Sequence, residues 1–176
     1  MLQAEDIPGL QKCKQSDVWA GLMLRGQPEM LPTGMASWSH LQTAGATEGW
    51  ISMYADDVSE CVFIFGVGSL QGRLVYSAAI KFKDSMSAAA DYASDSQAFP
   101  VAADFLARFE AAGGKLTKGA STGFGENSAV ATVAYRGVPT YVVFWQSKNF
   151  EAIVWADNGS ASEGEAAATR MNGRIR

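Results

Sequence analysis

The chain has 176 residues, which is enough for one domain with a single hydrophobic core and rather few for two. Hydrophobic residues make up 48% and charged residues 18% of the sequence, which excludes the low-hydrophobicity, high-charge composition of disordered chains. With 14 Lys and Arg against 18 Asp and Glu, the formal net charge is -4, which excludes a general electrostatic attraction to nucleic acid or to an anionic membrane.

No stretch of the sequence approaches the roughly 18 uninterrupted apolar residues of a membrane-spanning helix. The first residues, MLQAEDIPGL, lack both the basic and the apolar region of a signal peptide. We therefore expect a soluble chain. If the natural protein is exported, we expect its signal, or a lipid anchor, to lie upstream of this sequence.

Residues 1–35 are expected to form an irregular N-terminal segment, because prolines and glycines interrupt every periodic pattern there. A short helix over residues 17–24 is compatible with the sequence. Such a segment needs apolar anchors, or a bridge between Cys13 and Cys61, to hold it to the rest of the domain. We place the sheet-and-helix body at residues 36–176 and expect a single domain.

Three strands are predicted in the first half of this body. Residues 50–55 alternate in the manner of a strand, and the acidic pair after them ends the pattern. Residues 61–68, CVFIFGVG, form a continuous apolar run, which is typical of a strand covered on both faces. Residues 73–84 have one apolar face and one that becomes polar toward the end, which indicates a half-buried strand.

The hydrophobic period then changes to that of a helix. Asp84 or Ser85 can cap a first helix, and Pro100 suits the first turn of a second helix that ends at Gly113. A polar, glycine-rich connection is expected over residues 115–127.

A closing helix is predicted in SEGEAAATRMNGRI, where Ser162 and Glu165 have the spacing of a capping box. Its helical period would direct Ala168, Met171 and Ile175 toward the sheet.

The stretch from Ser128 to Asn158 is rich in Val, Ile, Tyr, Phe and Trp and is interrupted twice, at residues 136–139 and 147–149. This pattern predicts three strands in a β-meander. Because the connections inside each group of strands have hairpin length, we predict an α+β fold. The expected architecture is a single-domain sandwich with a largely antiparallel six-stranded sheet, in the order three strands, two helices, three strands and a closing helix.

Two cysteines, Cys13 and Cys61, are compatible with one disulfide or with two buried free thiols, and their number does not decide between these. His40 is the single histidine, and no closely spaced pair of His or Cys ligands is present, so we expect no metal and no cofactor. A nucleophilic Cys61 assisted by His40 is an alternative, because such partners meet only in the fold. Burial in an apolar strand would raise the pKa of the Cys61 thiol and favours an inert or bonded sulfur.

Two glycine-rich stretches, residues 66–72 and 123–127, precede strands instead of helices, so we interpret both as turns and not as phosphate-binding loops. Asp56, Asp57 and Glu60 cluster in one loop. Their spacing does not match that of an EF-hand, and a solvated acidic turn is the default interpretation.

Large aromatic side chains are the remaining candidates for a binding site. Trp50, Tyr54, Trp145 and Trp155 could line an apolar cleft between the sheet and its helices. Residues of this kind more often form the core, by roughly three to one. We assign ligand binding to these four residues and name no catalytic residue.

Several segments in sequence order resemble one known pattern: DIPG (6–9), GWISMY (49–54), IKFKDSMSAAADYA (80–93), GFGENSA (123–129), YVVFWQSKNFEAIV (141–154) and AAATRMNGRI (166–175). The pattern is that of bacterial cell-envelope proteins with the PsbP-like fold, which include surface lipoproteins and extracellular sensor domains of receptor kinases. The resemblance implies an α/β sandwich with an antiparallel sheet, export, and ligand sensing or protein binding without catalysis. It supplies no catalytic residue, and this sequence allows one disulfide where the kinase sensor domains usually have two.

Our leading hypothesis is a non-catalytic, exported binding or sensor domain of the bacterial cell envelope that recognises a small apolar molecule or a protein partner. One alternative is a cysteine-dependent hydrolase or transferase that uses Cys61 and His40. Another is a structural envelope protein that assembles with copies of itself through an edge or face of the meander. No hypothesis includes a nucleic-acid partner.

Overall fold

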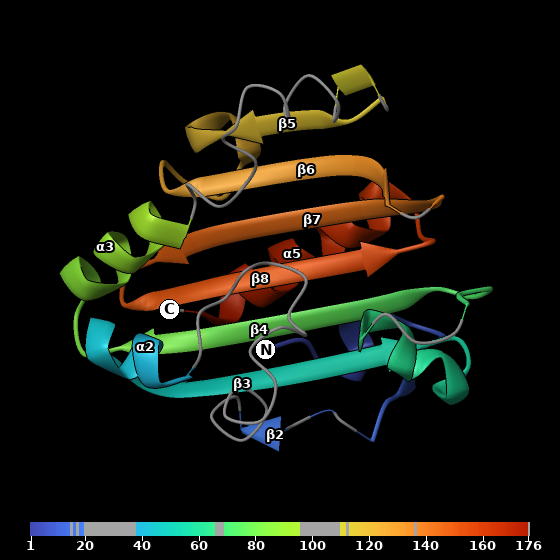
Figure 1. The fold of residues 1–176 in the computed structure, drawn as a ribbon, viewed down its shortest axis with the longest axis horizontal. Helices are drawn as coiled ribbons and strands as arrows, with labels where there is room; N and C mark the ends of the chain where they lie inside the picture. The colour runs from blue at the N-terminus through green and yellow to red at the C-terminus, as the bar shows by residue number, and fades with distance from the viewer. Residues whose placement is uncertain are drawn as a thin grey trace.

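The computed structural model describes residues 1–14, 16, 18–19, 38–65, 69–95, 110–111, 113–135 and 137–175. In this part of the chain eight strands form one antiparallel sheet in the order β1-β3-β4-β8-β7-β6-β5, with β2 paired to β3 outside that path (Figure 1). The strands are β1 (Gln11–Lys12), β2 (Val18–Trp19), β3 (Ala46–Ala55), β4 (Leu74–Phe82), β5 (Lys115–Lys118), β6 (Ser128–Tyr135), β7 (Val138–Ser147) and β8 (Phe150–Asp157). The predicted α+β fold is confirmed, with eight strands where six were expected.

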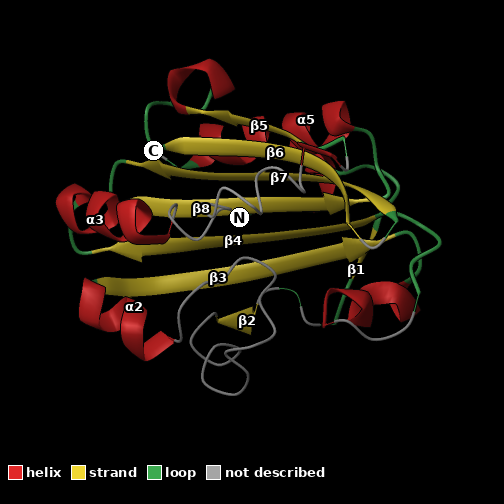
Figure 2. Cartoon of the chain, turned by 45° about the horizontal axis from the view of Figure 1, so that its top comes forward, coloured by secondary structure: helices red, strands yellow, loops and turns green. Residues whose placement is uncertain are grey.

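Helices cover both faces of the sheet (Figures 1 and 2). Two of them, α2 (Trp38–Ala44) and α3 (Ser85–Asp95), pack on one face, which we call the α3 face, and α5 (Ala161–Arg174) packs on the other, the α5 face. Short 3-10 helices are η1 (Ala4–Asp6), η2 (Val58–Phe65) and η3 (Gly119–Thr122). Among the helices of the described residues, none has both the length and the apolar character of a membrane span.

The predicted meander is confirmed as β6, β7 and β8. Its two connections are tight turns: Gly137 has a φ of 79° before β7, and Lys148 has a φ of 52° before β8. β8 then pairs along its length with β4, with Trp155 opposite Tyr76. The central pair of strands therefore comes from distant parts of the chain, and it joins the first strands of the sheet to the meander.

Successive side chains of a strand point to opposite faces, so the sheet supports two hydrophobic clusters. On the α3 face the buried side chains include Trp38, Ile51, Met53, Phe82, Tyr92 and Phe144. On the α5 face they include Leu2, Tyr54, Val143, Trp145, Val154 and Met171. Ala168, Met171 and Ile175 are all buried in this second cluster, which confirms the face that the helical period predicted for them.

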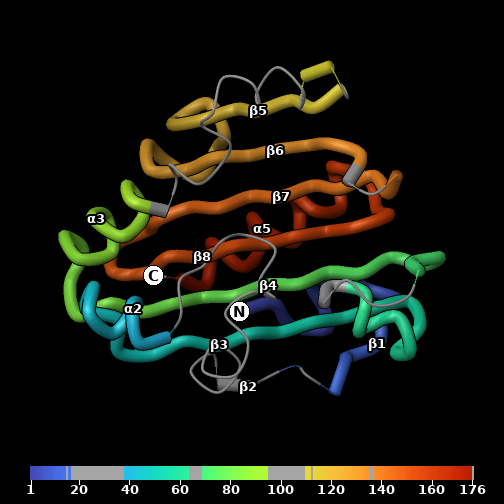
Figure 3. The backbone as a smooth tube through the Cα atoms, viewed as in Figure 1, coloured from blue at the N-terminus to red at the C-terminus, as the bar shows by residue number. Residues whose placement is uncertain are grey.

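Residues 1–10, which we call the N-terminal strap, lie on the α5 face (Figure 3). Leu2 is 1% exposed, and its carbonyl accepts a hydrogen bond from the buried hydroxyl of Ser52 at 3.3 Å. Farther along the strap, Asp6 forms an ion pair with Arg174 near the end of α5. Part of the segment that the sequence led us to expect as irregular is thus fixed to both the sheet and a helix.

The strand predicted over residues 61–68 is wrong. The chain there forms the 3-10 helix η2, and residues 66–68 lie outside the described part. Cys61 is 1% and Phe63 8% exposed, whereas Val62 between them is 39% exposed, so residues 61–63 are buried on one side only. A short apolar run carries no period that separates a strand from a helical segment, and this ambiguity caused the error.

Several further strands and helices differ from the expectation. β1 and β2 lie inside the segment expected to be irregular, and β5 lies inside the connection expected over residues 115–127. The closing helix begins at Ala161, and its capping box is formed by Ser160 and Glu163, two residues before the predicted pair Ser162 and Glu165. α2 was not predicted. The helices considered over residues 17–24 and between Pro100 and Gly113 fall almost entirely outside the described residues.

Candidate functional site

A cleft of about 220 Å³ opens on the α5 face, between the N-terminal strap, the start of β4, the end of β8 and the first turns of α5. We call it the strap cleft. The apolar residues of its lining are Ile7, Pro8, Leu10, Val75, Ala156 and Ala166. Its charged lining includes Asp6, Arg73, Glu163 and Arg170. Because these residues come from four distant segments, the cleft exists only in the folded chain.

The position of α5 defines one wall of the cleft. A Cβ atom added to Gly164 would lie 2.4 Å from Cδ1 of Tyr141, so the helix approaches β7 more closely than any other residue type would allow. The helix begins at a capping box in which the Ser160 hydroxyl accepts from the N–H of Glu163, and Oε2 of Glu163 accepts from the N–H of Ser160 at 2.8 Å. This box fixes the Glu163 carboxylate in the lining of the cleft.

Arg73, directly before β4, links three segments at one end of the cleft. Its Nε and Nη2 donate to the carboxylate of Asp56 at 3.1 and 2.9 Å, and its Nη1 donates to Oε1 of Glu163 at 3.1 Å. Hydrogen bonds from Arg73 lower the pKa of Asp56. Hydrogen bonds from Ser160, and then from Arg73, lower the pKa of Glu163. Both side chains are therefore ionised at neutral pH.

The acidic loop before β4 is more than the solvated turn that the sequence led us to expect. The carboxylate of Glu60 accepts from the N–H groups of Gln71 at 2.8 Å and of Gly72 at 3.0 Å. Asp56 accepts from both the side chain and the N–H of Arg73. Two of the three predicted acidic residues thus fix the chain that carries Arg73 into the cleft.

Asp6 and Arg170 also line the cleft, and Arg174 of α5 binds Asp6 beside it. Asp6 is 3% exposed, and Nη1 of Arg174 donates to its Oδ1 at 3.0 Å. Arg170 donates instead from Nη1 to the main-chain carbonyl of Asp6, at 2.6 Å. Among the described residues, no carboxylate lies within ion-pair distance of Arg170.

The four aromatic residues that we assigned to ligand binding do not meet in one place. Trp145 and Tyr54 are 0% and 3% exposed on the α5 face, and Nε1 of Trp145 donates to Oδ1 of Asn172 at 2.9 Å. Trp155 is half-buried against the α3-face cluster, and Trp50 is half-buried on β3. None of these four residues lines the strap cleft.

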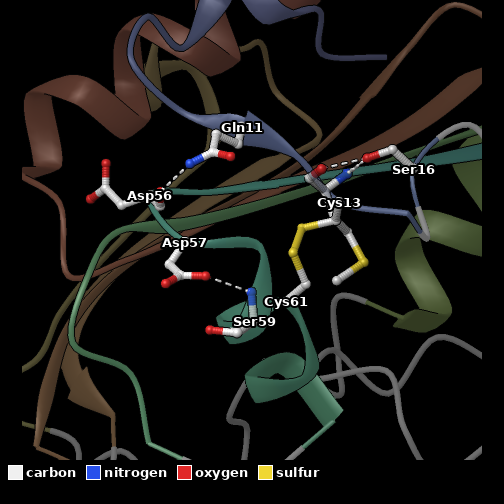
Figure 4. Close-up of a disulfide and its surroundings, with 8 residues drawn as sticks. Gln11, Cys13, Ser16, Asp56, Asp57, Ser59 and Cys61 are labelled. Carbon is white, nitrogen blue, oxygen red and sulfur yellow. Dashed lines mark hydrogen bonds between the residues drawn. A yellow bond between two sulfur atoms is a disulfide. The ribbon is translucent and has the colours of Figure 1, made fainter.

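Cys13 and Cys61 form a disulfide that joins the segment after β1 to η2 (Figure 4). Both cysteines are buried, at 2% and 1% exposure, and the N–H of Cys13 donates to the carbonyl of Met53 at 2.9 Å. The disulfide predicted as one of two alternatives is confirmed. A bonded sulfur supplies no thiolate, so the hypothesis of a nucleophilic Cys61 assisted by His40 loses its nucleophile.

Other buried ionisable side chains lie on the α3 face. Asp91 of α3 and Glu151 of β8 are 5% and 1% exposed, and their side chains interact. Burial raises the pKa of Asp91, and the nearby charge of His40 opposes this effect. Burial, together with the charge of Glu151, raises the pKa of Tyr92 to about 12. Within the described residues, no three His, Cys, Asp or Glu side chains are arranged to hold a metal ion.

No known family model matches the sequence, and no curated protein matches it either. Among solved structures, the extracellular domain of PknH from Mycobacterium tuberculosis is similar to this chain, with a TM-score of 0.44 and 8% sequence identity. The similarity covers 94% of this chain and 81% of that one. At this identity and score, it carries no argument about function.

Proposed function

We propose that this chain is a non-catalytic binding domain of an exported or cell-envelope protein and that the strap cleft is its ligand site. The observation that carries the proposal is the cleft of about 220 Å³, with aliphatic side chains in its lining and charged side chains beside them. Small-molecule sites combine apolar walls with a few polar groups at fixed positions. Ion pairs already hold Asp6, Arg73 and Glu163 in place, so a ligand would have to order few side chains.

The size of the cleft favours a small ligand. Typical ligand pockets have volumes of roughly 300 to 1,000 Å³, and this one is smaller. We expect a compact molecule that places an apolar part against Val75 and Ala156. Stable recognition of a folded protein requires a contact area of roughly 1,000 Å² or more, which a cleft of this size does not provide by itself. A small molecule is therefore favoured over a protein partner at this site.

The buried disulfide supports the exported location in this proposal. Disulfides persist in oxidising compartments and are rare in the reducing cytosol. The narrower roles of lipoprotein or kinase sensor domain, and a relation to the PsbP-like fold, rest on the sequence segments quoted above.

Self-assembly through the free edge of the meander receives no support from β5. This edge strand has four residues, and Lys115 and Lys118 are both exposed on it. Short edge strands that carry lysine disfavour pairing with a second sheet. We expect a monomer in sedimentation experiments across protein concentrations, and a concentration-dependent dimer would favour the structural alternative.

The proposal is tested by a ligand-observed NMR screen of small fragments against the intact, oxidised chain, followed by affinity measurements on two variants. Ala166→Phe places a ring in the lining of the cleft. Thr169→Phe places the same ring at an exposed position of α5 that does not line it. We expect the hits to lose most of their affinity for the first variant and to keep it for the second. A screen without hits, or hits that bind Ala166→Phe unchanged, would count against the proposal.

The same screen tests the aromatic residues. Trp155→Leu changes the half-buried tryptophan of the α3-face cluster. If the hits lose affinity for this variant and keep it for Ala166→Phe, the ligand site lies on the α3 face, and the sequence prediction at Trp155 is supported.

A further inference from the structure

We propose that the ligand of the strap cleft is a small amphipathic acid, a molecule with a short hydrocarbon part and one carboxylate, and that Arg170 binds this carboxylate. The inference rests on the proposed function, because it names the ligand class of the same site. It follows from the charge balance of the cleft, the hydrogen bonding of Arg170 and the aliphatic lining.

The charge balance leaves one cation of the described lining without a carboxylate partner. Asp6 is ion-paired with Arg174, and Glu163 is ion-paired with Arg73. Arg73 also holds Asp56, so its charge is more than compensated. Among the described charged residues of the cleft, Arg170 is the cation that no carboxylate neutralises.

One more acidic residue, Asp157, belongs to the lining but does not compensate Arg170. Its Oδ1 accepts from the hydroxyl of Thr140 at 2.6 Å, and these two residues are paired across β7 and β8. The neighbouring pair, Tyr141 and Ala156, belongs to the α5-face cluster, so the side chains of Thr140 and Asp157 point to the α3 face. The carboxyl group of Asp157 therefore lies on the far side of the sheet from Arg170.

The hydrogen bonding of Arg170 orients its guanidinium group. One of its five N–H donors is used by the carbonyl of Asp6, at 2.6 Å, which holds the group against the strap. A carbonyl oxygen satisfies a donor without neutralising the charge. The remaining donors have the fork geometry that binds a carboxylate through two parallel hydrogen bonds.

The aliphatic lining determines the rest of the ligand. Ile7, Val75 and Ala156 are 7%, 7% and 3% exposed, and Leu10 is half-buried beside them. The transfer of a hydrocarbon from water to a position against these side chains is favourable. Because Arg170 is exposed, its attraction for an anion in water is weak by itself, so a bare carboxylate such as acetate should bind poorly. Both parts of the ligand are needed.

Isothermal titration calorimetry on the intact, oxidised chain tests this inference with octanoate, octan-1-ol and acetate as probes. We expect octanoate to bind more tightly than either of the others. Arg170→Gln should weaken octanoate binding by about tenfold and octan-1-ol binding much less. Arg170→Lys keeps the charge but loses the pair of parallel hydrogen bonds. Its affinity for octanoate should lie between those of the wild type and of Arg170→Gln. Lys118→Gln is the control, because it removes one positive charge from an exposed position on β5.

The outcomes separate this inference from the proposed function. Octan-1-ol binding as tightly as octanoate, octanoate binding to Arg170→Gln unchanged, or no octanoate binding at all would each overturn the inference. The proposed function would still stand if Ala166→Phe removes the binding of fragments or of octan-1-ol. Thermal unfolding of each variant checks that the fold is intact, and we expect it to be so because Arg170 is exposed.

Discussion

Arg73 and Glu163 are 90 positions apart in the chain and meet in the lining of the strap cleft, where Nη1 of Arg73 lies 3.1 Å from Oε1 of Glu163. The contact joins the start of β4 to the first turn of α5. Glu163 also forms the capping box with Ser160, so one carboxylate serves both the start of the helix and the wall of the cleft. Changes at this residue should therefore affect the stability of the fold and the shape of the site together.

Glu163→Ala removes both interactions of that carboxylate. We expect the free energy of unfolding to fall by about 1 kcal/mol, chiefly through the lost cap. The ion pair with Arg73 should add little, because 54% of the Glu163 side chain is exposed. Urea denaturation measures the change, and Glu165→Ala is the control that removes the same charge from an exposed position on the same helix. Equal losses in the two variants would contradict the role of Glu163 in the capping box.

Two glycines of α5 form a matched pair. At Gly164 an added Cβ would meet the ring of Tyr141, with Cγ at 2.8 Å, whereas at Gly173 it would meet nothing within 4 Å. We expect Gly164→Ala to destabilise the fold by about 1 to 3 kcal/mol, because the helix must move away from the sheet. Gly173→Ala should raise stability by up to about 1 kcal/mol through its helix propensity. Thermal unfolding compares them, and the same sign of change in both would contradict the close packing at Gly164.

The disulfide closes a sequence separation of 48 residues. In the chain-entropy model such a loop contributes about 4 kcal/mol, so the double variant Cys13→Ala with Cys61→Ala should be less stable by that order. Chemical denaturation of the wild type with and without reductant gives the same comparison in one protein. Reductant should have no effect on the double variant, which serves as the control. A loss well under 1 kcal/mol would show that the segment around Cys13 is held mainly by its other contacts.

The buried carboxyl group of Asp157 should make the stability of the fold depend on pH, in a direction that follows from its pKa. Burial raises the pKa of its carboxyl group above the ordinary value of 3.8. The folded protein therefore binds this proton more tightly than the unfolded chain does. The stability that proton binding at Asp157 contributes is fully present at low pH and is lost as the pH rises through the folded-state pKa. Asp157→Asn should be more stable than the wild type at pH 7, and the difference should shrink toward pH 4.

Thermal unfolding across this pH range measures the effect. Asp57→Asn is a control in which the change in stability has the opposite sign. Hydrogen bonds from Ser59 lower the pKa of Asp57, so its carboxylate stabilises the fold above the ordinary pKa, and the variant should be less stable than the wild type at pH 7. A stability difference for Asp157→Asn that does not vary with pH would contradict the raised pKa.

The parts of the fold that depend on local patterns could be predicted from the sequence. The meander follows from strand-forming residues between two turns, and α3 follows from a cap and a change of hydrophobic period at Asp84. η2 could not be predicted, because a short apolar run has no period and its path is set by a disulfide partner 48 positions away. β1 and β5 are too short to leave a pattern and are defined only by pairing with β3 and β6.

The aromatic residues show what turn geometry adds to such patterns. With the turn at Lys148 and Asn149, Trp145 pairs with Ala152, so Trp155, an odd number of positions farther along β8, must point to the opposite face. That relationship was present in the sequence and separates two of the predicted site residues. The strap cleft was not predictable in the same way, because Arg73 and Arg170 belong to no motif and line the same cleft only through the packing of distant segments.

The most direct test of the strap cleft as the ligand site is a set of amide ¹H–¹⁵N spectra of the intact chain, recorded while a fragment hit is titrated. If the site is correct, the largest shift changes occur at the amides of Ile7, Gly159 and Gly164, and the indole N–H of Trp155 on the α3 face changes little. The largest change at the indole N–H of Trp155, with the strap and α5 unaffected, would contradict it.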